Sequence, residues 1–377
     1  MIRGSILSTL LLNAVCSQRC TLPITAVDSI TPAIEHTRQQ LFRPFRIGQW
    51  TKLAFVGLLA GELGGNGFNR SNFRIPAHPA AGPHPGFPGS LGIDPALLAA
   101  LGALVGVIIV AGLAIGIILM YVGSVMRFVL FDNIVAKECH IRWSWSRRLD
   151  PGWKYFVWKL LYVLLTLAGI AILVGIPLAI VFAKGWHREP KEHLPALVFG
   201  GAILFLVFFI FFVATRVIFV LTKDFVVPQM ALENVDAMEG WRRLWPMMQA
   251  EKGAYAAYIV MKIVLAIVVG ILIGVASLIL GLLFVLPTVG LSILAVLTGK
   301  AAGLTWNAYT ITLAIVVGCI LLAVFLYLVA LISVPALVFF PAYSMYFFAG
   351  RYPQLAAVLY PAPPAAPVPA GAGFSPP

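Results

Sequence analysis

The sequence has few charged residues and few cysteines. Only 11% of the 377 residues are charged, against about 25% in an average soluble domain, whereas 61% are hydrophobic. This composition excludes a soluble globular protein. The cysteines are too few and too scattered for a disulfide framework or a zinc site, which needs ligands at paired short spacings: Cys16, Cys20, Cys139 and Cys319.

Acidic residues are also scarce. The chain has 14 Asp and Glu against 26 Lys and Arg, a formal net charge of +12. Polar stretches are too short to form a nucleic-acid-binding module, so we expect no nucleic acid partner. Basic residues beside membrane spans attract anionic lipid headgroups, and we expect the bilayer and its headgroups to be the partners.

Long hydrophobic runs dominate what remains. A spanning helix needs about 20 mostly apolar residues. Five such stretches occur, at about 95–121, 157–183, 196–220, 256–286 and 308–334. A shorter one, 51–65, reaches only half to two-thirds of that length and either crosses or re-enters. The sequence therefore predicts an all-α fold, a polytopic transmembrane helical bundle of about six spans with cytoplasmic interfacial helices, or five if 51–65 does not cross.

Three regions follow from the composition along the chain. Residues 1–30 form an N-terminal extension of signal-like or disordered character, 31–352 a transmembrane helical domain with a Gly/Pro-rich loop at 61–94, and 353–377 a disordered Pro/Ala-rich tail. Thr31 and Pro32 suit the cap and first position of a helix that leads towards Trp50.

The distribution of Lys and Arg predicts the orientation. Eighteen of them fall on one side of the predicted spans and six on the other, with Arg3 and Arg19 set aside. The positive-inside rule therefore predicts that both termini lie in the cytoplasm. The outer six are Arg70, Arg74, Lys184, Arg188, Lys191 and Lys300.

The connection between the fourth and fifth long spans is the most informative segment. Asp236 and Glu239 have capping-box spacing, and Met238, Trp241 and Trp245 form an apolar stripe beside two arginines. We expect an interfacial helix here, either a structural elbow or a lipid or partner contact. The contact candidates at the cytoplasmic surface are Arg147, Arg148, Lys159, Trp241, Arg242, Arg243, Trp245 and Lys262.

A resemblance is carried by this segment and two others. In this segment a span is followed by Pro228, Glu233 and a helix from Ala237 to Trp241. This pattern resembles that of bacterial proteins grouped with the membrane domain of glycerophosphoryl diester phosphodiesterases and related uncharacterised families. The segments 33–50 and 334–343 resemble the same group. The resemblance covers about 31–352 and implies architecture only. It brings no catalytic residue, because the phosphodiesterase barrel with its metal-binding carboxylates is missing.

Other motifs give weaker predictions. The loop with His187, Glu189, Glu192 and His193 has ligand-type residues, but Pro190 breaks their register, so we expect a solvated turn and no metal or cofactor. The motifs Gly102-x-x-x-Gly106, Gly112-x-x-x-Gly116 and Gly270-x-x-x-Gly274 predict close helix packing, by default within the chain.

A Tyr-x-x-x-Lys motif begins two of the spans, at Tyr155–Lys159 and Tyr258–Lys262, and is either a weak parallel repeat or a common interfacial composition. The centres of the spans contain no charge, and we expect Lys159 and Lys262 to extend to the cytoplasmic surface.

These patterns favour a non-enzymatic membrane scaffold or a lipid- or partner-interacting protein. No nucleophile, carboxylate pair or histidine-based metal motif lies within a predicted span, so we do not expect an enzyme. The alternative is a transporter or permease for an apolar or lipid-like substrate, which apolar walls would accommodate.

Overall fold

The computed structural model describes residues 25–62, 95–138, 141–186, 193–301, 303 and 307–360. Every regular element in these residues is helical. The predictions for 1–24, for most of the Gly/Pro-rich loop, for the loop 187–192 and for the tail from 361 lie outside the described residues.

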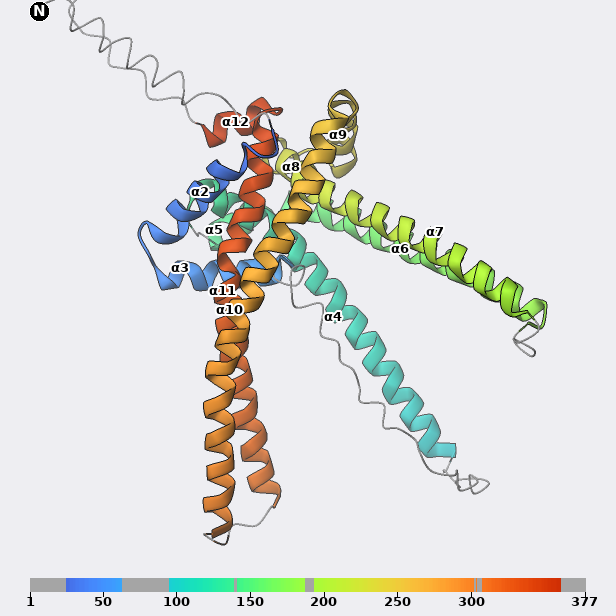
Figure 1. The fold of residues 1–377 in the computed structure, drawn as a ribbon, viewed down its shortest axis with the longest axis vertical. Coiled ribbons are helices and arrows are strands. Elements are labelled where there is room, and N and C mark those ends of the chain that lie inside the picture. The colour runs from blue at the N-terminus through green and yellow to red at the C-terminus, as the bar shows by residue number, and fades with distance from the viewer. Residues whose placement is uncertain are drawn as a thin grey trace, which may run out of the picture.

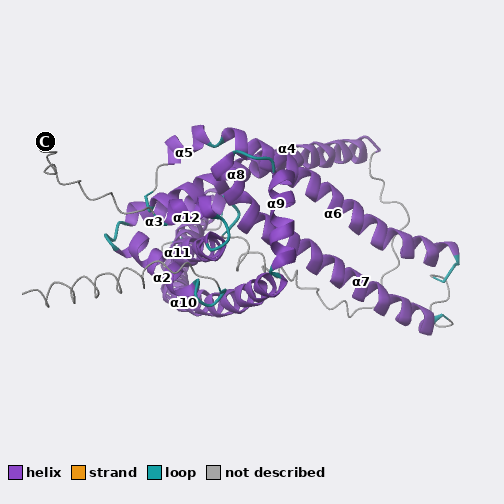
Figure 2. Ribbon diagram, turned by 90° about the horizontal axis from the view of Figure 1, so that it is seen from above, coloured by secondary structure: helices purple, strands orange, loops and turns teal. Residues whose placement is uncertain are grey.

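The helices form a hub from which three arms diverge (Figure 1). One arm is α4 (Pro95–Ala136), and each of the others is a hairpin, α6 with α7 and α10 with α11. Seen from above, α6 and α7 leave the hub side by side (Figure 2). These helices are α6 (Leu149–Ala183), α7 (Leu194–Leu221), α10 (Lys252–Ala301) and α11 (Ala308–Ala349).

The hub consists of short helices and the proximal ends of the arms. The short elements are α2 (Ile30–Phe42), α3 (Ile47–Leu59), α5 (Ile141–Arg147), the π-helix η2 (Thr222–Val226), α8 (Val227–Glu233), α9 (Ala237–Ala250) and α12 (Pro353–Leu359). Both described ends of the chain, α2 and α12, lie in the hub (Figure 1). They therefore lie on the same side of the arms.

Five helices in the described part of the chain are long and apolar enough to span a membrane, which is the number expected if 51–65 does not cross. The short first segment is α3, whose 13 residues extend about 20 Å, less than the hydrocarbon core of about 30 Å. Leu53 and Val56 are fully buried, and α3 packs against α4 and α11. Its apolar residues serve the hub core.

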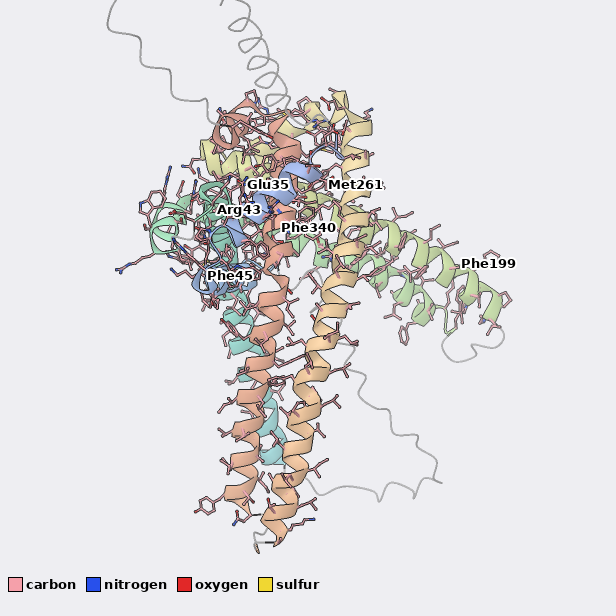
Figure 3. The ribbon with its side chains drawn as sticks, turned by 60° about the vertical axis from the view of Figure 1, so that its left-hand side comes forward. Glu35, Arg43, Phe45, Phe199, Met261 and Phe340 are labelled. Atoms are coloured by element: carbon pink, nitrogen blue, oxygen red, sulfur yellow. The ribbon has the colours of Figure 1, made fainter. Side chains whose placement is uncertain are left out.

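The arms bury almost nothing within the chain. In four of the five candidate spans the most apolar window is 0% buried, and in the fifth it is 6% buried. Phe199, near the far end of the α6–α7 arm, is 75% exposed (Figure 3). Helices that are apolar on all sides and exposed along their length are typical of lipid-immersed segments. The structure thus supports a helical membrane protein.

An aromatic core holds the hub together. Tyr258 stacks on Phe347 with ring centroids 4.6 Å apart and on Tyr343 at 5.3 Å, and Phe225 packs against Tyr258 at 5.0 Å. All four side chains are fully buried. They come from η2, α10 and α11, so this core joins the α10–α11 arm to the π-helix.

Two predicted boundaries move by a few residues. The first helix begins at Ile30 after Ser29 rather than after a cap at Thr31. At the other end, Pro353–Leu359 is helical within the segment predicted to be disordered, because Leu355 is fully buried in the hub. Asp236 does occupy the N-cap of α9, but its side chain makes no capping hydrogen bond and pairs instead with Lys154.

The glycine motifs do not pack against other described residues, contrary to prediction. A Cβ atom added at Gly102, Gly106, Gly112, Gly116, Gly270 or Gly274 meets no heavy atom within 4 Å. Close contacts occur at glycines outside those motifs. A Cβ at Gly123 would lie 2.7 Å from the backbone oxygen of Leu59, and one at Gly152 would lie 2.6 Å from Val125. These glycines allow α3, α4 and α6 to approach one another in the hub.

The two kinds of glycine on α4 give a matched test. We expect Gly123→Ala to lower the free energy of unfolding by about 1–3 kcal/mol, because the backbone of Leu59 cannot yield. Gly112→Ala should raise it slightly, by up to about 1 kcal/mol, because alanine favours helix and meets nothing. Unfolding of the purified protein by SDS in mixed micelles measures both, and equal effects would contradict the assignment.

Candidate functional site: a buried charge cluster where the arms meet

A π-helix places two opposite charges where the arms converge. Segment η2 continues α7 into α8 and carries Lys223 and Asp224 side by side in an otherwise apolar stretch. Asp224 is 3% exposed. π-helical turns inside α-helices are rare and occur frequently at functional sites. We therefore take η2 as the centre of the candidate site.

Three ionised side chains meet on one side of η2. Arg127 Nη1 of α4 lies 2.9 Å from Glu62 Oε1, an ion pair in which the N–H is not directed at the oxygen. Arg127 Nη2 donates to the carbonyl of Ala60 at 3.0 Å. The other oxygen of Glu62 accepts from Lys223. Glu62 thus joins the end of α3 to both α4 and η2.

A second ion pair lies on the α10 side of η2. Lys262 Nζ donates to Asp224 Oδ2, and the hydroxyl of Tyr258 donates to the same oxygen at 2.9 Å. The side chain of Lys262 is 15% exposed, so the expectation that it extends to the cytoplasmic surface is wrong. Its ammonium instead neutralises a buried carboxylate.

Neighbouring charges keep Glu62 ionised. Burial alone would raise the pKa of this carboxyl, but the ammonium of Lys223 and the guanidinium of Arg127 outweigh burial and lower the pKa to about 2. Glu62 is therefore a carboxylate at any physiological pH. A small cavity of about 30 Å³ adjoins it, lined also by Arg127, Lys223 and Asp224.

A further buried ion pair braces the hub beside this cluster. Arg148 donates to both carboxylate oxygens of Asp132, at 2.8 and 2.6 Å, and its third nitrogen donates to the carbonyl of Ala231. Bidentate pairs of this kind fix geometry as well as charge. Arg148 thus connects α4 to α8 from the loop before α6.

The predicted contact residues divide into paired and exposed groups. Arg148, Lys262 and Arg243 are bound to carboxylates, Trp241 donates to Thr222, and Lys159 is half-buried. Arg242 lies 3.5 Å from a carboxylate oxygen of Glu239, but its side chain is 83% exposed. Trp245 is also exposed, and Arg147 is exposed beside the ring of Trp143. The site that the structure assembles shares only Lys262 with the predicted set.

A groove of about 530 Å³ lies between α2 and the base of the α10–α11 arm. Its walls are apolar side chains of α10 and α11, and α2 contributes Ile34, Thr37, Arg38 and Phe42. The volume is within the range of about 300–1,000 Å³ that is typical of small-molecule sites. Arg38 is the basic residue in its lining.

A buried histidine holds α2, one wall of this groove, in place. His36 is 2% exposed; Nε2 lies 2.9 Å from the carbonyl oxygen of Ile134, and Nδ1 lies 3.1 Å from the hydroxyl of Tyr346. A neutral ring satisfies both contacts, with Nε2 donating and Nδ1 accepting. Burial, and then the charge of Lys137, lower the pKa of His36 to about 4.

Comparison with known proteins places the chain in a family. Residues 24–358 match the model of a family of unknown function, DUF7544. The chain belongs to this family. The match covers the hub as far as residue 358 and all five candidate spans, and nothing in the comparisons links the chain to the phosphodiesterase membrane-domain group. No curated protein and no solved structure matches the chain.

Sequence reasoning missed Glu62, Arg127, Lys223 and Asp224 as a unit. The sequence alone predicts that Arg127 and Lys223 are orienting charges at the cytoplasmic ends of spans, and it places Glu62 in the Gly/Pro-rich loop at 61–94. One signal was available: an adjacent Lys–Asp pair inside a continuous apolar run needs partners of opposite charge.

Removing the charge of Glu62 should destabilise the hub. Glu62→Gln leaves Arg127 and Lys223 buried without their carboxylate, and we expect a loss of about 3 kcal/mol in the free energy of unfolding. Glu35→Gln is the matched control: it breaks an exposed pair with Arg38 and should cost less than about 1 kcal/mol. Unfolding in mixed micelles compares the two; similar losses would show that the buried cluster is not a main support.

Protonation of His36 should destabilise the fold in mild acid. In the unfolded chain His36 binds a proton with a pKa of about 6.5. The folded value of about 4 means that stability is complete above pH 6.5 and is lost as pH falls towards 4, by at most about 3 kcal/mol. Melting temperatures at pH 7 and pH 4.5 should differ more for the wild type than for His36→Gln. A difference of the same size in both would exclude His36 as the cause.

Proposed function

We propose that this family member is a non-enzymatic membrane protein that binds an anionic phospholipid in the groove between α2, α10 and α11. The observation that carries the proposal is the groove itself, which combines apolar walls from two lipid-immersed helices with a basic residue on α2. A phospholipid has the same combination of an apolar chain and a charged phosphate.

The charge around α2 favours an anionic headgroup. Arg38, Arg43, Arg46 and Lys52 are exposed on or beside α2 and α3, where the acidic residues near the surface are the exposed Asp28 and the half-buried Glu35. Glu35, Arg43 and Phe45 lie together on this side of the hub (Figure 3). Exposed basic residues next to an apolar membrane surface attract anionic lipid. In this proposal the acyl chain lies along α10 and α11, and the phosphate contacts Arg38.

The distribution of basic residues also supports an orientation of the protein in the membrane. The hub carries most of the Lys and Arg of the described residues, whereas the far ends of the arms carry Lys184 and Lys300. By the positive-inside rule we propose that the hub lies in the cytoplasm of a bacterial cell, at the cytoplasmic membrane. The exposed residues Arg147, Arg242 and Trp245 would then face headgroups or a protein partner.

Transport of an apolar or lipid-like substrate is the alternative function. It is favoured by ionisable residues such as Asp224 and Lys262 that are buried within the candidate spans. In membrane proteins such residues often line the pathway of a substrate, an ion or a proton. Against it, the two hairpins diverge from the hub, so their far halves do not enclose a shared site in one chain (Figure 1). Movement of fluorescent lipid across vesicles containing the protein would favour transport over binding alone.

Lipid selectivity tests the proposal. Native mass spectrometry of the detergent-purified protein should show several-fold more bound phosphatidylglycerol than phosphatidylcholine with the same chains. Arg38→Ala should remove that preference, because the phosphate loses its cation, while Arg147→Ala, an exposed arginine elsewhere on the hub, should keep it.

A second variant tests the chain-binding part of the groove. Ala276→Trp places a bulky side chain in the groove and should lower the binding of both lipids, whereas Val268→Trp, an exposed position on the same helix outside the lining, should not. Unchanged binding by Ala276→Trp, or unchanged selectivity by Arg38→Ala, would contradict the proposal.

A further inference from the structure

The cavity beside η2 has the features of a small ion-binding site. It measures about 30 Å³, enough for one water molecule or an ion of similar size. It lies between α4, η2, α8 and α11, and its charged lining is Glu62, Arg127, Lys223 and Asp224. A phospholipid cannot enter a space of this size, so this site is separate from the groove.

The charged cluster as a whole has one positive charge in excess. The cavity lining itself has two positive and two negative charges, and Lys262, which pairs with Asp224 outside the lining, adds a third positive charge. Arg127 is 6% exposed, and the side chains of Lys223 and Lys262 are 20% and 15% exposed, so each cation is largely withdrawn from water. An excess positive charge that is withdrawn from water is unfavourable unless an anion accompanies it.

The acidic groups at the cavity are already engaged. Both oxygens of Glu62 face cations, and Oδ2 of Asp224 accepts from Lys262 and Tyr258. The basic groups retain unused donors. Arg127 Nε is buried and has no hydrogen-bond partner among the described residues, and Lys223, which donates to Glu62, has three ammonium protons.

We propose that this cavity binds a monatomic anion, chloride under physiological conditions. The Arg127 Nε–H and the Lys223 ammonium donate to the ion, which neutralises the excess charge at the point where α3, α4 and η2 meet. The size of the cavity excludes sulfate, phosphate and organic anions. The inference does not depend on the proposed lipid site, since it rests on different residues.

Halide-dependent stability tests the site in the full-length protein in detergent. At constant ionic strength, replacing sodium gluconate by sodium chloride should raise the melting temperature by several degrees, and the rise should saturate, because a ligand that binds only the folded state stabilises it. Bromide should act like chloride, and sulfate should act like gluconate. Identical melting temperatures in chloride and gluconate would mean that water fills the cavity, and would overturn the proposal.

A pair of buried arginines supplies matched variants. Arg127→Lys keeps the charge beside Glu62 but removes the Nε–H donor, and it should abolish most of the chloride-dependent rise. Arg148→Lys alters an equally buried arginine, paired with Asp132, and should lower the melting temperature while keeping the rise. An undiminished rise in Arg127→Lys would place the anion elsewhere and contradict the proposal.

Direct binding decides the question if Arg127→Lys does not fold. Line broadening of the ³⁵Cl resonance by the wild-type protein should be reversed by bromide and left unchanged by gluconate. Absence of bromide-sensitive broadening would again exclude an anion site. Lipid selectivity is measured on the same samples. The anion site and the lipid groove are then tested separately, because the absence of chloride binding does not affect lipid selectivity, and the reverse also holds.

Discussion

The neutralisation of buried charge around η2 is the constraint on which the rest of the structure depends. Glu62, at the end of a short helix, contacts Arg127 of one arm and Lys223 of the π-helix, and Asp224 contacts Lys262 of another arm. A buried charge that loses its partner is far more costly than an exposed one. These pairs therefore fix which helices meet in the hub and in what register.

The arms cannot provide that specificity. Their most apolar windows are almost wholly exposed, and lipid tails are as apolar as the leucine and valine side chains that contact them. No hydrophobic force therefore draws the exposed part of α4, beyond the hub, towards either hairpin. The directions in which the arms leave the hub follow from the ion pairs, the aromatic stack of Tyr258 and Phe347, and the close approach of α4 to α3 at Gly123.

Composition and apolar run length were sufficient to predict the fold class and the five long spans, because both depend on local sequence. Whether the first apolar segment crosses the membrane or packs in the hub could not be predicted from hydropathy alone. Residues 51–65 have the hydropathy of a short span, yet Leu53 and Val56 face protein rather than lipid, and hydropathy does not separate the two environments. Likewise, glycine spacing predicted packing at Gly112, where none occurs, and gave no sign of Gly123.

The charge cluster shows why the site was harder to predict than the fold. Counting Lys and Arg by loop treats each as an independent charge at a membrane surface, and for exposed residues such as Arg242 that treatment holds. For Lys223 and Lys262 it fails, because their partners lie 161 and 38 residues away in sequence. An adjacent pair of opposite charges in an apolar run indicates that partners exist, but only the path of the chain identifies them. That path places Glu62 between two cations, and the same arrangement leaves the cluster with one positive charge more than its carboxylates can balance.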